Sequence, residues 1–213
     1  MEANLNQRNI VIRVVAISFL FGALLFQACA EKPQPEESCN FVQNSLKQRV
    51  SWENDVPVVF YIHRSVPGPF FGAIEQAIEE WNIKAGRELI KIGGWTNSGE
   101  KPEKDGANIV YWLNSWEKDR PFEQARTTIY WSEDRIYEAD IRVNSKNFNF
   151  FWVEDPIVGH VDVQSLLLHE FGHALGLAHA PNTQESVMVT TLASATLRRE
   201  AQSVDLSSLS CEY

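Results

Sequence analysis

The sequence predicts an α+β fold, in which helices cover a mixed, twisted β-sheet of about five strands. Strand-like and helix-like runs follow one another in the order β-α-β-β, which is typical of a mixed sheet with helices on its faces. The chain has 213 residues, of which 44% are hydrophobic and 11% aromatic. This length and composition suit one packed domain with its own core.

Residues 57–63 (PVVFYIH) are apolar and rich in β-branched side chains, which predicts the first strand. The next run, residues 71–85, carries apolar side chains at helical spacing and glutamates on its other faces. The apolar positions are Ile74, Ala77, Ile78 and Trp81. This pattern predicts an amphipathic backing helix that stops at Gly86.

The remaining strands are predicted by four β-like runs. Residues 88–92 and 108–113 form two of them, separated by the polar, glycine-containing loop 93–106. Residues 126–131 and 135–143 predict a hairpin, because only a short polar turn lies between them.

Residues 161–175 predict a second helix, which carries the candidate site. Its apolar stripe follows Asp162, whose carboxylate suits the positive end of the helix dipole. His169 and His173 are four residues apart, so both imidazoles project from one face and can bind one ion. Glu170 sits one step around the helix, where it can contact a water on that ion.

Gly176 allows the chain to leave this helix through a left-handed conformation that most residues avoid. The turn can then bring His179 to the same ion. Three neutral imidazoles leave an open position for water, which is the catalytic type of zinc site. Imidazole ligands and tetrahedral geometry favour one Zn2+, although cobalt or copper can bind such a site in vitro.

The stretch from residue 169 to residue 179 (HEFGHALGLAH) resembles the active-site motif of the metzincin metalloproteases, and its setting is most similar to the matrixin branch. The likeness extends over residues 52–213 and includes a methionine, Met188, after the third histidine. The resemblance implies a zincin-like fold with an active-site helix, a backing helix and a C-terminal helix.

The resemblance also implies roles for single residues. Three zinc ligands are implied, namely His169, His173 and His179. Glu170 would act as general base and then as general acid, and Met188 would form a hydrophobic floor below the metal in a tight turn. A substrate would lie extended along an edge strand, for which the order of the chain favours residues 126–131.

Three features depart from the matrixin pattern. Ala180 follows the third histidine, where matrixins usually have Ser. No P-R-C-G segment precedes the domain, so the sequence predicts no cysteine switch. The loop that holds structural zinc and calcium in animal matrixins has no evident counterpart, so we expect no second zinc, and Ca2+ is left open.

These observations predict a zinc-dependent metalloendopeptidase that acts on proteins or peptides. One alternative is a non-proteolytic, surface-anchored zinc-binding protein, and another is a hydrolase of non-peptide amides. Loss of Glu170 or of a ligand would mark the first alternative, and neither is lost. The net charge of -9, without a cluster of Lys and Arg, argues against nucleic acid as a partner. We expect a monomer.

The N-terminal segment predicts export. Two arginines precede residues 14–26, an apolar stretch too short for a membrane span of about 20 residues but suited to a signal peptide. Residues 25–29 (LFQAC) resemble a bacterial lipobox, in which Cys29 is lipidated. The alternatives are ordinary signal cleavage near position 28 or 30, and an uncleaved anchor.

The predicted organisation is a lipoprotein-type signal peptide (residues 1–28), a Pro- and Glu-rich tether (29–38) and a metzincin catalytic domain (39–213). The lipid would attach the protein to a membrane. Ala30 favours the outer membrane of the cell envelope under bacterial sorting rules, facing the periplasm or the exterior. Without the lipid, the protein would be secreted.

Lipidation of Cys29 would leave Cys39 and Cys211 as a pair. In an oxidising compartment this pair can form a disulfide that closes almost the whole domain. The alternative is two free thiols.

Overall fold

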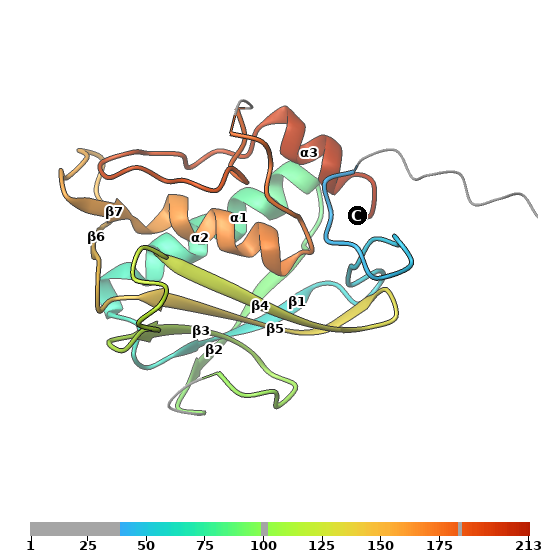
Figure 1. Cartoon of the computed structure of the whole chain (residues 1–213), viewed down its shortest axis with the longest axis horizontal. Helices are drawn as coiled ribbons and strands as arrows, with labels where there is room; N and C mark the ends of the chain where they lie inside the picture. Colours follow the sequence, from blue (N-terminus) through green and yellow to red (C-terminus); the bar gives the residue numbers. More distant parts are fainter. Residues whose placement is uncertain (1–38, 99–101, 183–184) are drawn as a thin grey trace, which may run out of the picture. The chain divides into compact units, whose positions relative to one another are not determined.

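The computed structural model describes residues 39–98, 102–182 and 185–213 (Figure 1). The predicted signal peptide, the tether and Cys29 lie outside these residues. Among the described residues, no helix has both the length and the apolar character that crossing a membrane requires.

A five-stranded sheet forms the base of the domain (Figure 1). Its strands are β1 (Val58–His63), β2 (Ile90–Thr96), β3 (Asn108–Leu113), β4 (Ala125–Ser132) and β5 (Arg135–Asn144). The order across the sheet is β2-β1-β3-β5-β4, in which β4 is antiparallel to β5 and the other pairs are parallel. The predicted mixed sheet is confirmed, and β4 lies at its edge.

Two helices, α1 (Phe71–Ala85) and α2 (Val163–Ala174), pack against each other and cover one face of the sheet (Figure 1). Trp81 of α1 is fully buried and donates its indole N–H to the Leu168 carbonyl of α2 over 2.9 Å. Phe171 of α2 meets Phe60 of β1 edge-on, with ring centroids 5.3 Å apart. These contacts fix the depth and rotation of α2 on the sheet.

The short helices and a second sheet complete the fold. A 3-10 turn, η1 (Gly68–Phe70), leads into α1, and the C-terminal helix α3 (Ser203–Leu209) packs beside α1. The strands β6 (Asn149–Phe151) and β7 (His160–Asp162) form a small parallel sheet that the sequence did not predict. Three residues are too few to show a strand-like alternation.

The predicted loop 93–106 is wrong at its start, because β2 continues to Thr96. Glycines suggested a loop, yet Gly93 belongs to the strand. A side chain at this position would overlap the Tyr61 ring of the paired strand β1. Gly93 therefore marks a close approach between side chain and backbone within the sheet, which single-sequence reasoning cannot distinguish from a turn.

Candidate active site

The N-terminus of α2 is fixed by Asp162, which has no exposed surface. Its carboxylate accepts hydrogen bonds from the Ser165 backbone N–H over 2.9 Å and from the Ser165 hydroxyl over 2.6 Å. Arg199 pairs with the same carboxylate over 2.6 Å. A capped and charge-neutralised start gives α2 one defined register, which in turn fixes where its histidines point.

His169 and His173 lie on one face of α2, and His179 returns to them after the helix ends. The two helical Nε2 atoms are 3.0 Å apart, and those of His173 and His179 are 3.1 Å apart. Gly176 makes the return possible, since its φ of 98° is a conformation that side chains disfavour. The three histidines form a single cluster of potential metal ligands.

Backbone carbonyls determine the tautomers of the two helical histidines. Nδ1 of His169 lies 2.7 Å from the Val187 carbonyl, and Nδ1 of His173 lies 2.8 Å from the Leu177 carbonyl. A carbonyl only accepts hydrogen bonds, so each Nδ1 carries the proton and each Nε2 presents a lone pair. Lone pairs at 3.0 Å repel one another unless a cation lies between them.

The histidine cluster therefore fits a zinc ion. Tetrahedral ligands at zinc–nitrogen distances of about 2.0–2.1 Å stand about 3.3 Å apart, close to the observed spacing. Burial lowers the pKa of His169 and of His173 to about 4, and it also lowers the pKa of His179. All three imidazoles are thus neutral at neutral pH, as metal ligation requires.

Glu170 is buried beside the histidines, at 4% exposure. Burial raises the pKa of its carboxyl group, while the neighbouring His173 and a hydrogen bond from Thr127 oppose that shift. The Thr127 hydroxyl on β4 donates to Glu170 Oε2 over 2.6 Å. A carboxylate held in this way, next to an open metal position, has the environment of a general base.

Met188 is buried and packs against α2. Its sulfur fills the space above Gly172, where any Cβ would overlap it. The turn that carries Met188 is held from α3 by Asp205, which accepts hydrogen bonds from the Ser186 hydroxyl and the Val187 N–H. Because the carbonyl of Val187 binds His169, α3 also helps to orient the first histidine.

An open cleft of about 670 Å³ lies over these groups. Its walls come from β4, from α2 and from the segment 187–192 that follows the turn. All three histidines and Glu170 line it, together with Thr127 and Arg198. The cleft thus places a buried carboxylate and a cluster of three imidazole nitrogens beside an open sheet edge.

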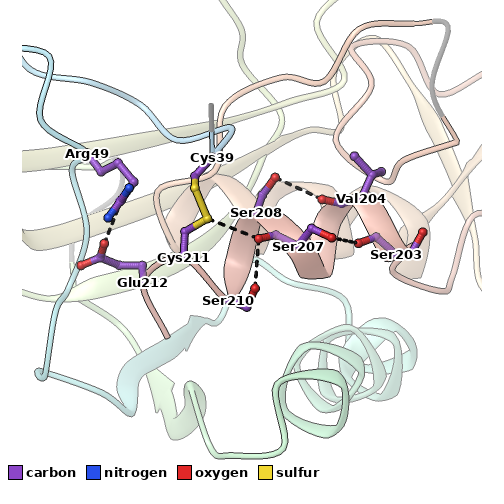
Figure 2. Close-up of a disulfide and its surroundings, with 9 residues drawn as sticks. All are labelled: Cys39, Arg49, Ser203, Val204, Ser207, Ser208, Ser210, Cys211 and Glu212. Carbon is purple, nitrogen blue, oxygen red and sulfur yellow. Dashed lines mark hydrogen bonds and ion pairs between the residues drawn. A yellow bond between two sulfur atoms is a disulfide. The ribbon is translucent and has the colours of Figure 1, made fainter. Parts of the chain in front are cut away.

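The structure brings together the predicted residues His169, Glu170, His173, Gly176, His179 and Met188. Cys39 and Cys211 form a disulfide with a Cα–Cα distance of 6.2 Å, on the side of the domain where α3 ends (Figure 2). No motif in the sequence marks Thr127 or the Val187 carbonyl as part of this site. Thr127 lies on the predicted edge strand, but nothing local shows that its hydroxyl faces Glu170.

A comparison with known protein families gives a match. A family model described as Matrixin matches residues 76–210. The matched range contains α2, the third histidine, the Met188 turn and α3. No curated protein matches the chain.

Proposed function

Because the chain belongs to the matrixin family of zinc metalloproteases, we propose that it is an endopeptidase in which Glu170 serves as the general base. The fold and the family membership agree with the predicted resemblance. The observation that carries the proposal is the convergence of three Nε2 lone pairs, two of them fixed by carbonyls, beside a buried carboxylate.

The chemistry divides between the metal and the protein. When bound by His169, His173 and His179, Zn2+ lowers the pKa of a ligated water to near 7 and polarises the scissile carbonyl. Glu170 accepts the proton of the attacking water and returns it to the leaving amine. Thr127 keeps the Glu170 carboxylate turned toward the cleft wall at β4.

The substrate is an extended segment of protein chain. Strand β4 pairs with β5 on one side only, so its other edge offers backbone donors and acceptors along the cleft. An extended peptide can add to such an edge as a further strand, which brings its backbone past the histidines. This arrangement supports cleavage within chains rather than at their ends.

A cleavage assay on a mixed peptide library tests the proposal. Glu170→Gln should retain zinc and lose at least about a hundredfold in rate, the usual scale of general acid–base catalysis. A chelator should abolish cleavage, and added Zn2+ should restore it. Zinc binding without cleavage by the wild type would instead support the alternative of a non-proteolytic, surface-anchored zinc-binding protein. Cleavage restricted to non-peptide amides would support the alternative of a hydrolase that acts on such amides.

We also propose that the enzyme is an exported, monomeric lipoprotein anchored through Cys29. The lipobox-like residues 25–29 and the disulfide support this view, since disulfides persist in oxidising compartments. The mass of the N-terminal peptide from the membrane fraction should include two or three acyl chains. Cys29→Ser should release the protein from that fraction, and an unmodified N-terminus in the wild type would refute lipidation.

A further inference from the structure

The turn between the second and third histidines is held by both ends of the domain. Five consecutive carbonyls, from residue 174 to residue 178, accept hydrogen bonds. Their donors are, in order, the Trp52 indole, the Tyr213 hydroxyl, the Val42 backbone N–H, His173 Nδ1 and the Asn40 side-chain amide. Four of these donors lie outside the helix and its turn.

We name residues 39–52 and 211–213 the terminal clasp. Within it, Phe41 forms an antiparallel bridge with Leu177, which is a residue of the turn. Gly176 packs so closely that a Cβ there would overlap the Val50 carbonyl oxygen. The turn therefore has no room to shift toward the clasp, and its contacts with the clasp fix the position of its backbone.

Asn40 makes the contact nearest to the third histidine. Its carbonyl accepts the Ala178 N–H over 2.7 Å, and its side-chain amide donates to the Ala178 carbonyl over 2.8 Å. Both backbone groups of the residue immediately before His179 are thus bound by one residue. His179 itself is exposed, and its ring contacts those of His169 and His173. On its other side, Ala180 donates its N–H to the Met188 carbonyl over 2.8 Å.

Several links fasten the two halves of the terminal clasp to each other. They include the disulfide and the Arg49–Glu212 pair, which Figure 2 shows, and a hydrogen bond from the Trp52 backbone N–H to the Tyr213 hydroxyl over 3.1 Å. The Cys39–Cys211 disulfide is the covalent one, and it stands next to Asn40 in the chain. Glu212 pairs with Arg49 over 3.1 Å and accepts a hydrogen bond from the Ser51 hydroxyl over 2.7 Å. Asn40 is therefore anchored, through its neighbour Cys39, to the segment that follows α3.

We infer that Asn40, anchored by the Cys39–Cys211 disulfide, is a positioning residue that sets the place of the third imidazole and thereby the affinity for zinc. This inference rests on the proposed zinc site. A metal site needs its ligands within a few tenths of an ångström of their final places before binding. The backbone on both sides of the exposed His179 is held, at Ala180 by Met188 and at Ala178 by Asn40, and Asn40 is the holder that belongs to the clasp.

Zinc affinity tests the inference directly. The zinc dissociation constant of the full chain is measured by competition with a chromogenic chelator, and the visible spectrum of the Co2+ form reports ligand geometry. Asn40→Ala should weaken zinc binding about fivefold, and Cys39→Ser with Cys211→Ser should weaken it at least tenfold. Both variants should lower the intensity of the tetrahedral Co2+ bands.

Asn44→Ala is the matched control. Asn44 lies in the same segment, but its amide binds Gln48 and the Glu133 carbonyl and makes no hydrogen bond to the turn. This variant should lose some stability and keep the wild-type zinc affinity and Co2+ spectrum. Circular dichroism and thermal unfolding identify any variant that fails to fold, in which case Asn40→Ala against Asn44→Ala decides.

Two results would overturn the inference. One is wild-type zinc affinity and Co2+ spectrum in both Asn40→Ala and the folded variant without the disulfide. The other is an equal loss of zinc affinity in Asn40→Ala and Asn44→Ala. That result would mean that the clasp stabilises the fold as a whole and does not position His179. Failure of the wild type to bind either metal would overturn the proposed function first, and the inference with it.

Discussion

The Thr127 hydroxyl of the edge strand donates a 2.6 Å hydrogen bond to the Glu170 carboxylate of α2. It links the proposed general base on the helix to the strand on which a substrate would lie. Since Thr127 pairs with Ile141 in the sheet, its backbone cannot follow Glu170 if that side chain rotates. The bond therefore selects one rotamer of the Glu170 side chain.

Thr127→Val keeps the shape of this side chain and removes the hydroxyl. A hydrogen bond to a charged group contributes about 1.5–3 kcal/mol, so we expect kcat to fall at least about tenfold while KM changes little. Steady-state kinetics on one peptide, with zinc content measured in parallel, check this. Thr127→Ser should recover most of kcat, and a Val variant as fast as the wild type would refute the role.

Zinc removal should destabilise the fold, because only the folded chain brings the three histidines together. At a zinc concentration of about 1,000 times Kd, the bound ion adds about 4 kcal/mol to the free energy of unfolding. Calorimetry with and without chelator should therefore show a large drop in Tm. Glu170→Gln should keep this difference, whereas His179→Ala should lose most of it.

Gly172→Ala should destabilise the protein by about 1–3 kcal/mol, since the new methyl group overlaps the Met188 sulfur in a packed interior. Urea unfolding measures the loss. In the double variant with Met188→Ala, the new methyl group no longer meets the sulfur. The loss in the free energy of unfolding should therefore be smaller than the sum of the two single losses. Gly68→Ala is the control, because a Cβ there meets nothing within 4 Å.

Asp140 should give the fold a pH dependence outside the active site. Burial raises the pKa of its carboxyl group to about 7, and Glu138 and Asp105 add to the shift, while the Ile109 N–H and Arg142 oppose it. One of its oxygens, Oδ2, is buried without a hydrogen-bond partner among the described residues. The charged form is therefore poorly stabilised.

Between about pH 4 and pH 7 the folded protein retains a proton on Asp140 that the unfolded chain has released. Unfolding becomes easier as pH rises through this window, by an amount on the order of 3 kcal/mol. Urea unfolding of the chelated protein across that range should show the decline, and Asp140→Asn should flatten it. A parallel decline in both proteins would assign the effect to other groups.

The histidine motif and both long helices could be predicted from the sequence because their signals are local. Four-residue spacing places His169 beside His173 on any α-helix, and a repeating apolar face marks the helix that carries Trp81. The β4–β5 hairpin was also predicted, since only a short turn separates its strands. These features follow from neighbours along the chain.

The rest depends on contacts that no local pattern marks. The order of strands across the sheet, the Thr127–Glu170 bond and the Asn40–Ala178 pair join positions far apart in sequence. Gly93 shows the same limit, because whether a glycine turns the chain or admits a neighbouring ring is decided by its partner. The pairing of Cys39 with Cys211 was foreseen only conditionally, from the arithmetic of three cysteines.

The disulfide joins residues that are 172 positions apart. We therefore expect the terminal clasp to close only after most of the domain has folded. Contacts between such distant positions form late in folding, because the chain entropy of the intervening loop opposes them. We therefore expect the third histidine to be fixed in place later than the two histidines of α2. A chain whose clasp has not yet closed would carry the motif without the assembled histidine cluster.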